Sequence, residues 1–166
     1  MKKLLLLLMC LPAFAQTGFK AEGKDVVWEK AFSTDNANIV AILDRNPNLK
    51  VAGFMDNMYK GMAFEVQNTC DGGTGLMKNP VKFDFIVLTD PAGYVVKIRN
   101  LKILEKYGPM QSRTRANPSE NYFMDGETLK TEGVAQQNME CLGNFLSALF
   151  APPTEMESPT SLTSNK

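Results

Sequence analysis

The chain has 166 residues, 18 of them basic and 18 acidic, and it contains no histidine. This length suffices for one domain with a hydrophobic core but not for two. Without histidine the chain cannot form a Ser-His or Cys-His catalytic pair, and it lacks the commonest zinc ligand. A near-neutral charge gives no electrostatic footprint for nucleic acid. We expect no cofactor and no nucleic-acid partner.

Residues 1–15 have the pattern of a secretory signal peptide. Two lysines precede an apolar run over residues 4–11, and Ala13-Phe14-Ala15 is a small-residue cleavage site. The apolar run is too short to span a bilayer. Cys10 offers a rival, lipid attachment, but the preceding Met9 is bulkier than lipoprotein processing normally accepts. Cleavage would leave 16 basic and 18 acidic residues, a net charge of −2. We expect an exported protein, periplasmic or extracellular, without stable membrane insertion.

The first half of the mature chain alternates strand and helix patterns. Residues 16–23 form a polar leader that we expect to be flexible, and a single α+β domain is expected over 24–150. Strands are predicted at 25–32, 48–55 and 62–68, the second weakened by its glycine. Met62, Phe64 and Val66 share the apolar phase of the third strand. A helix is predicted at 35–45, capped from residues 33–35 and burying Ile39, Val40 and Leu43.

Residues 81–104 predict a β-hairpin with one buried face. Asp90, Pro91 and Gly93 supply the turn between two β-rich runs. The apolar positions of the first arm are Val81, Phe83, Phe85 and Val87, and those of the second are Tyr94, Val96 and Ile98. The apolar phase shifts at Asn100–Leu101, which we interpret as a β-bulge rather than the end of the strand.

The last third of the chain has an irregular segment followed by a long helix. Residues 105–130 contain four Gly or Pro residues and predict no long regular element, only a short edge strand near 122–124. Residues 131–150 have a helical apolar stripe. Its members are Val134, Cys141, Leu142, Phe145 and Leu149, widened by Met139, Leu146 and Phe150. Residues 151–166 are rich in proline, serine and threonine, and we expect a disordered tail.

These elements predict an α+β fold, in which an antiparallel sheet of about five strands is covered on one face by two helices. The order is similar to the TATA-box-binding-protein-like and helix-grip folds. The leader ending AFAQ, the stretch VVWEKAF, and the strand GYVVKIRNLKIL far ahead of CLGNFLSALF resemble a family of small exported Bacteroidetes proteins of unknown function with that fold. The resemblance covers most of residues 24–150. It implies a fold and no activity, and DNA binding does not follow from a fold name.

Cys70 and Cys141 remain after cleavage, and an oxidising compartment permits them to pair. The alternative is a free Cys141 that packs on an apolar helix face.

The glycine run 71–75 has no helix directly after it, so it predicts a flexible connection rather than a phosphate loop. Met55, Met58 and Met62 could offer soft ligands to copper, but two of them can equally cap core strands.

Two groups of residues are candidates for ligand binding. Trp28, Phe64, Phe83, Tyr94 and Phe145 would project between the sheet and the last helix, where a gap either closes as core or opens as an apolar pocket. Arg113 and Arg115, near Lys106, Tyr107 and Tyr122, could hold an anion or remain solvated.

The sequence favours a non-enzymatic exported binding or accessory domain. Its partner would be a protein, a glycan or a small apolar ligand, bound at the sheet edges or the 105–130 segment. One alternative is a hydrolase that uses carboxylates, for which the acids are Asp84, Asp90, Asp125 and Glu127. Another is a carrier of a small hydrophobic ligand between the sheet and the C-terminal helix.

Overall fold

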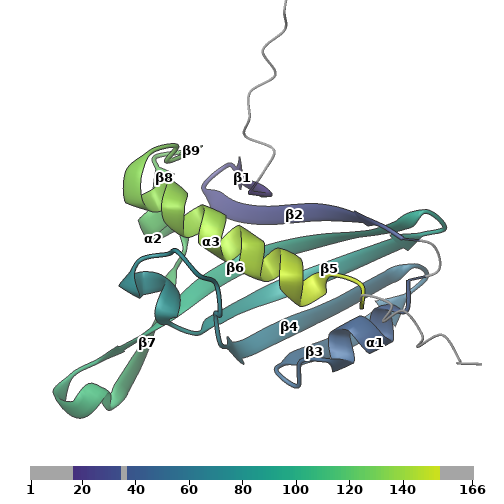
Figure 1. Ribbon diagram of the computed structural model, residues 1–166, viewed down its shortest axis with the longest axis horizontal. Helices are drawn as coiled ribbons and strands as arrows, with labels where there is room; N and C mark the ends of the chain where they lie inside the picture. The colour runs from purple at the N-terminus through teal and green to yellow at the C-terminus, as the bar shows by residue number, and fades with distance from the viewer. Residues whose placement is uncertain (1–16, 35–36, 154–166) are drawn as a thin grey trace, which may run out of the picture.

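A computed structural model describes residues 17–34 and 37–153. Its main sheet has seven antiparallel strands in the order β1-β2-β6-β5-β4-β3, and β7 pairs with the far end of β6 (Figure 1). The strands are β1 Phe19–Glu22, β2 Asp25–Ser33, β3 Leu49–Met55, β4 Met58–Val66, β5 Val81–Asp90, β6 Gly93–Tyr107 and β7 Arg113–Pro118. The predicted class is confirmed, but the sheet has seven strands rather than about five.

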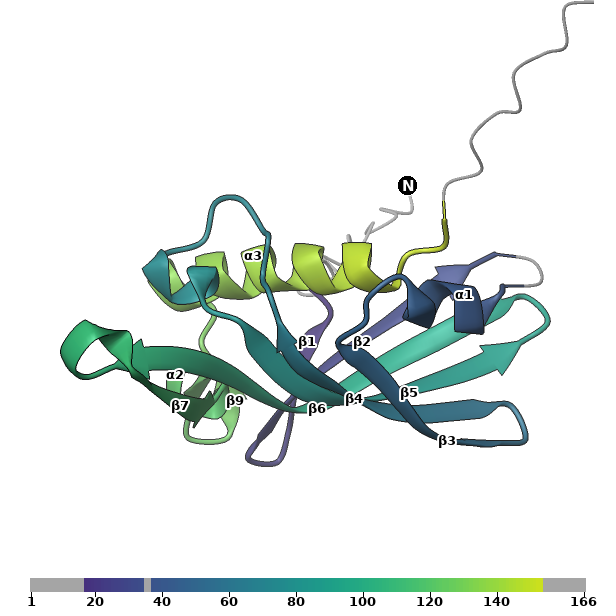
Figure 2. The ribbon, with the colours of Figure 1, turned by 90° about the horizontal axis from the view of Figure 1, so that it is seen from below.

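Helices α1 (Ile39–Asp44) and α3 (Gly133–Phe150) lie on the same face of the sheet (Figure 2). The remaining elements are α2 (Glu120–Phe123), the short strands β8 (Met124–Asp125) and β9 (Thr128–Leu129), and the 3₁₀ turns η2 (Gly75–Lys78) and η3 (Pro109–Gln111). No helix among the described residues is long and apolar enough to cross a membrane. The predicted signal peptide, residues 1–15, and most of the predicted tail lie outside the described residues.

The predicted central hairpin is present as β5 and β6. Val81, Phe83, Phe85 and Val87 are at most 2% exposed, as period-two burial requires. The Asp90 carboxylate accepts a hydrogen bond from the Ala92 N–H at 2.7 Å, which fixes the turn. The predicted bulge is confirmed. The register shifts between Lys82 and Asp84, and Asn100 has a φ of 52°, so that Leu101 returns to the buried face.

The N-terminal elements differ from prediction in three places. Residues 19–22, expected to be loose, form β1, because they fold back on β2 through a two-residue turn. Helix α1 begins at Ile39, and its cap is Asn38, whose Oδ1 accepts a hydrogen bond from the Ala41 N–H at 3.0 Å. Ile42 rather than Val40 is buried, because Ile39, Ile42 and Leu43 share one face of the helix and Val40, which is 52% exposed, lies off that face.

The phase predicted for the third strand is wrong. β4 buries Ala63 and Val66, whereas Met62 and Phe64 point to the opposite, uncovered face. A register shift between Ala63 and Val66, with a φ of 49° at Glu65, restores Val66 to the core. Phe64 was therefore assigned to the wrong face of the sheet.

The predicted irregular segment 105–130 is largely regular. β6 continues to Tyr107, and η3 reverses the chain into β7, so this stretch is a second hairpin that extends beyond the rest of the sheet (Figure 1). Met110 at its tip is 98% exposed. Sequence reasoning missed the hairpin because Gly108 and Pro109, which lie in its reversal, were interpreted as breaks in regular structure rather than as a turn between two strands.

Helix α3 is confirmed, and it forms the roof of the core. Leu142, Leu146 and Phe150 are completely buried against the sheet. Val134, predicted to lie in the apolar stripe, is 60% exposed because it lies in the first turn, beyond the sheet.

Candidate functional site

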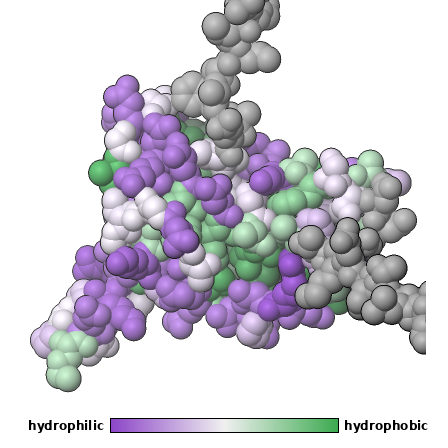
Figure 3. All heavy atoms as spheres, in the orientation of Figure 1, coloured by the Kyte–Doolittle hydropathy of each residue, from purple (hydrophilic) through white to green (hydrophobic). Residues whose placement is uncertain are grey.

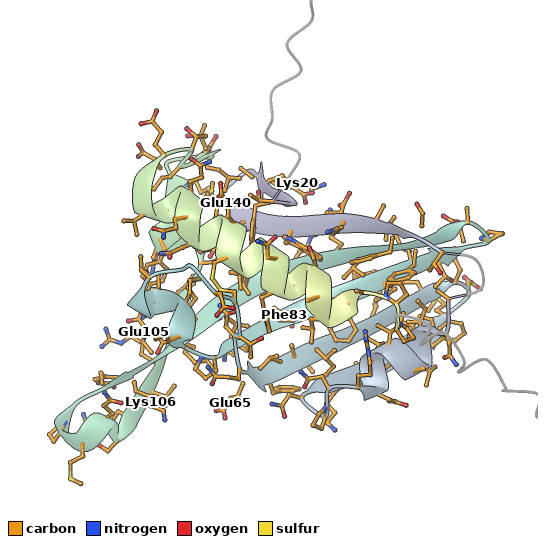
Figure 4. All side chains as sticks on the ribbon, in the orientation of Figure 1. Lys20, Glu65, Phe83, Glu105, Lys106 and Glu140 are labelled. Atoms are coloured by element: carbon orange, nitrogen blue, oxygen red, sulfur yellow. A yellow bond between two sulfur atoms is a disulfide. The ribbon has the colours of Figure 1, made fainter. Side chains whose placement is uncertain are left out.

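The space predicted as a ligand pocket between the sheet and α3 is filled by side chains. Trp28, Phe83 and Tyr94 are at most 2% exposed, and Phe145 is 8% exposed. The Phe150 ring lies 6.3 Å from that of Phe83, which Figure 4 labels beneath α3. This packing removes the basis of the hydrophobic-carrier hypothesis, because no space for a ligand remains around these rings.

An open groove lies instead at the margin of α3, between that helix, β1 and the β8–β9 hairpin. Its volume is ≈ 640 Å³, within the usual range of ligand sites. The buried side chains of Phe19 and Met139 form an apolar floor, and the polar residues Glu127, Lys130 and Gln136 stand at the rim. Figure 4 labels Glu140 on the part of α3 that lies beside β1. The groove thus has an apolar floor and polar walls.

The polar wall on α3 is a line of three residues. Gln136, Glu140 and Asn144 are spaced four apart, so they lie one above another on the helix surface. The Gln136 amide donates to the Glu140 carboxylate at 2.9 Å. In the space-filling view, hydrophilic residues cover most of the outer surface of α3, and hydrophobic residues are visible between α3 and α1 (Figure 3).

The free edge of β1 runs along this groove. The Glu29 N–H donates to the Gly18 carbonyl at 2.8 Å, so these two residues form a hydrogen-bonded pair of the ladder. Because such pairs alternate along an antiparallel ladder, the main-chain groups of Phe19 and Ala21 point away from β2. Opposite Ala21, the N–H of Val26 also points out of this pairing, and it donates to Glu120 at 3.0 Å.

The groove lining from this part of the chain consists of Thr17 and the two outward-facing residues of β1, Phe19 and Ala21. The Phe19 N–H has a weak partner in the Thr17 hydroxyl at 3.4 Å. Among the described residues, no hydrogen bond between main-chain groups engages the N–H or the carbonyl of Ala21 on this side. An edge strand with unpaired groups of this kind can accept another strand.

Trp28 positions β1 rather than a ligand. Its indole N–H donates to the Thr17 carbonyl at 2.9 Å. The same carbonyl lies against Gly143 of α3, where a Cβ would come within 2.5 Å of the oxygen. Glycine in a helix interior weakens the helix by about 1 kcal/mol, and the close approach of Thr17 explains why it is present here.

A charged network on the opposite face of the sheet holds the far end of β1. Glu22 contacts Lys97 at 2.7 Å and Arg99 at 2.5 Å, so β1 is tied to β6 across β2. The Lys97 ammonium first, then the Lys20 ammonium and the Arg99 guanidinium, lower the pKa of Glu22 from 4.5 to about 2. A hydrogen bond to Glu29 at 2.9 Å, and a second one to Glu22, raise the pKa of Lys20.

Cys70 and Cys141 form a disulfide, with their Cα atoms 5.4 Å apart. It joins the loop after β4 to the middle of α3, across a sequence separation of 71 residues. The neighbouring glycine run 71–75 leads into η2 and carries no helix suited to a phosphate. Gln137 and Asn138 of α3 hydrogen-bond to this loop at Gly72 and Thr74.

The remaining predicted site residues do not converge on one pocket. Arg113 and Arg115 lie on β7, where the Arg115 guanidinium stacks over the Tyr107 ring at 5.1 Å. The Tyr122 hydroxyl is directed to Glu105 instead. Anion binding by the two arginines stays a prediction.

The three methionines of the predicted copper motif are not gathered. Met55 and Met58 are paired across the β3–β4 turn, and Met62 lies four residues further along β4, about 13 Å away at the rise of a strand. Met55 and Met62 are 65% and 42% exposed, so the alternative that they cap core strands is also wrong. Among the described residues no group of three His, Cys, Asp or Glu side chains could hold a metal ion.

No family model matches the chain, and no curated protein matches it. It is similar to the crystal structure of a TBP-like protein from Parabacteroides distasonis ATCC 8503, with 11% identity over 79% of this chain and 91% of that one and a TM-score of 0.47. It is also similar to a DUF4468 family protein from Bacteroides ovatus ATCC 8483, with 15% identity over 84% and 94% and a TM-score of 0.45. These names agree with the resemblance predicted from the sequence.

Proposed function

We propose that the protein is an exported, non-enzymatic binding module that holds an extended peptide segment of a partner protein along β1. The observation that carries this proposal is the coincidence of the groove with the outward-facing main-chain groups of Phe19 and Ala21. A peptide strand placed there would pair with Ala21 through its N–H and carbonyl. Its alternate side chains would enter the groove above Phe19 and Met139.

The groove favours a short, extended ligand over a compact one. β1 has four residues, so a paired segment of similar length spans about 13 Å. Main-chain pairing would supply affinity, and the apolar floor would select the side chains that fill it. The polar line of α3 lies where side chains at the flank of such a peptide would reach it.

Export is supported by two independent features of the chain. Residues 1–15 have the composition of a signal peptide. The Cys70–Cys141 disulfide also suits an oxidising compartment, where such bonds persist. We assign the protein to the periplasm or the extracellular space.

A carboxylate hydrolase is the second candidate, because Glu127 and Glu140 both line the groove. Such an enzyme needs one carboxylic acid kept protonated by an apolar environment. Both side chains are exposed to solvent, and Glu140 is engaged by Gln136. These features favour binding over catalysis.

The proposal is tested with peptides selected by phage display on the immobilised, oxidised protein. Ala21→Pro removes the outward N–H without touching the bonds between β1 and β2. We expect the best peptide to lose at least tenfold in affinity, about the loss of one hydrogen bond plus a steric clash. Ala52→Pro is the matched control, because the register leaves Ala52 unpaired in the other edge strand, β3.

The Ala52→Pro variant should bind within twofold of the parent protein. Peptide binding should also slow hydrogen exchange at the Ala21 amide more than at Lys20, whose amide already bonds to β2. If Ala21→Pro binds the selected peptides as well as the parent does, strand pairing at β1 is wrong. If instead the parent protein cleaves a glycan substrate and Glu127→Gln and Glu140→Gln abolish that cleavage, the function is that of a hydrolase and not of a peptide-binding module.

A further inference from the structure

A second hollow lies on the uncovered face of the sheet, away from α1 and α3. Its volume is ≈ 380 Å³, and Met62, Phe64, Lys82 and Lys102 are among its lining residues. Met62 and Phe64 are 42% and 47% exposed, although both are large and apolar. Figure 2 shows no helix over β4 and β5 on this side. The hollow is separate from the groove beside β1.

Two β-bulges form this hollow. On one side of β5 the register with β4 shifts between Ala63 and Val66, and on the other side the register with β6 shifts between Lys82 and Asp84. Each bulge has a non-glycine residue in left-handed backbone, Glu65 at a φ of 49° and Asn100 at 52°. Such backbone is uncommon outside glycine, and bulges gather beside functional sites.

The bulges place two lysines directly opposite each other. Lys82 and Lys102 are cross-strand partners on the same face, an arrangement that is destabilising for like charges. Among the described residues, the salt bridges join Lys20, Lys97 and Arg99 to acids, and none reaches these two ammonium groups.

The acid in the lining of the hollow, Asp84, is turned to another partner. Its carboxylate accepts a hydrogen bond from the Asn100 amide at 2.5 Å and forms no salt bridge with either lysine, so the two lysines and this one acid leave the lining with a net positive charge. The hollow therefore has two lysines without a salt-bridge partner beside two exposed apolar side chains. A two-fold symmetric contact of this hollow with the hollow of a second copy is disfavoured, because it would bring lysines against lysines.

We propose that this hollow binds an anionic amphiphile, with the carboxylate or phosphate of the ligand between Lys82 and Lys102 and its apolar body on Met62 and Phe64. The anion would relieve the repulsion between the two ammonium groups, and the apolar body would cover side chains that now face water. The ligand is either a free acid or the headgroup region of an anionic lipid, since both present the same chemistry.

The first test is an NMR titration of the full mature protein with sodium laurate below its micelle concentration. We expect laurate to shift the amide resonances of residues 82–84 and 100–102. Lys82→Gln/Lys102→Gln should weaken binding at least tenfold, and Phe64→Ala should weaken it about fivefold by removing apolar contact. Lys60→Gln, on the same face of β4 but outside the hollow, should bind within twofold of the parent.

Two further measurements separate this proposal from a structural role of the lysines. The double variant should melt at the same temperature as the parent or about 1–2 °C higher, because it loses a like-charge pair. Acetate and inorganic phosphate should bind at least tenfold more weakly than laurate, because they lack the apolar body. Equal binding of laurate and acetate, or equal losses in Lys60→Gln and the double variant, would overturn the proposal.

The source of the ligand is decided by sedimentation with vesicles of equal parts phosphatidylcholine and phosphatidylglycerol. Binding to vesicles that is lost in the double variant identifies membrane lipid as the ligand. Binding of laurate alone identifies a free acid, and both results support the site. Binding of neither laurate nor vesicles shows that the hollow takes no anionic amphiphile.

Discussion

The two sides of α3 differ in packing: one side is packed tightly on the sheet, and the other borders an open groove. Over the centre of the sheet, Leu142, Leu146 and Phe150 leave no room between helix and strands. Along β1, the same helix presents Gln136, Glu140 and Asn144, and a groove of ≈ 640 Å³ remains. Apart from Phe19 and Met139, which belong to the core and also form the groove floor, the residues that line the groove are not those that fill the core.

The sharpest test of this difference compares two substitutions two residues apart on α3. Leu146→Ala should destabilise the protein by about 2–5 kcal/mol, because Leu146 is fully buried and its loss leaves a cavity. Asn144→Ala, at the groove, should change the free energy of unfolding by no more than about 0.5 kcal/mol. Urea unfolding measures both. Equal effects would mean that the groove flank is as much a part of the core as the filled flank.

The next largest effect is expected for the Cys70–Cys141 disulfide, which joins α3 to the loop after β4. Cys70→Ser/Cys141→Ser should lower the stability by about 2–4 kcal/mol, because the disulfide closes a long loop of the unfolded chain. Reducing the native protein should give the same loss, whereas the double variant should be insensitive to reductant. Thermal melts with and without reductant check this. A native protein that melts identically in both conditions would show that the bond does not stabilise the fold.

A smaller effect is expected where β6 meets the end of α3. The Tyr94 hydroxyl donates to the Phe150 carbonyl at 2.6 Å, so Tyr94→Phe should cost about 1–2 kcal/mol. Burial raises the pKa of Tyr94 from 10 to about 12. The stabilisation linked to this raised pKa is complete below pH 10 and is lost as pH rises toward 12. The free energy of unfolding of the parent protein should therefore fall more over that range than that of Tyr94→Phe.

The control for this alkaline effect is Tyr107→Phe, since Tyr107 is 41% exposed on the projecting hairpin. Its stability from pH 9 to 12, followed by circular dichroism, should match that of the parent. Should Tyr94→Phe retain the full alkaline loss of the parent, the Tyr94 phenol is not its source.

The smallest effect belongs to the charged network that holds β1 beside the groove. The pKa of Glu22 is about 2 in the folded protein against an ordinary 4.5. Its contribution is therefore present above pH 4.5 and is lost as pH falls through 2. Glu22→Gln should lower the melting temperature slightly at pH 6 and leave it closer to that of the parent at pH 2. A deficit that persists unchanged at pH 2 would contradict the assigned role of the charge.

Prediction from sequence succeeded where local patterns are strong. The alternation of Val81 to Val87, the turn at Asp90 and the bulge at Asn100 are all visible in the chain itself, and so is the apolar stripe of α3. It failed at β4, where Phe64 has a perfect alternating neighbourhood and yet faces away from the core. The register of β4 is set by its neighbour β5, and a pattern in one strand carries no information about that pairing.

The candidate groove had a partial signal in the sequence. The spacing of Gln136, Glu140 and Asn144 marks a polar line on α3, and Phe19 and Ala21 alternate with polar residues. Neither signal indicates that the two lie side by side, because residues 19 and 140 are brought together only when α3 packs on the sheet beside β1. The clue at Gly143 becomes interpretable only once Thr17 is seen against it.

The sequence by itself determined the class of fold, the central hairpin and the long closing helix, because periodicity and turn chemistry act over a few residues. Tertiary structure decided which face of β4 is buried, that the centre of the sheet–helix interface is closed, and that hollows lie at β1 and at the paired bulges. Those outcomes depend on how side chains from distant segments fill a shared volume, and the volume exists only after the segments have met.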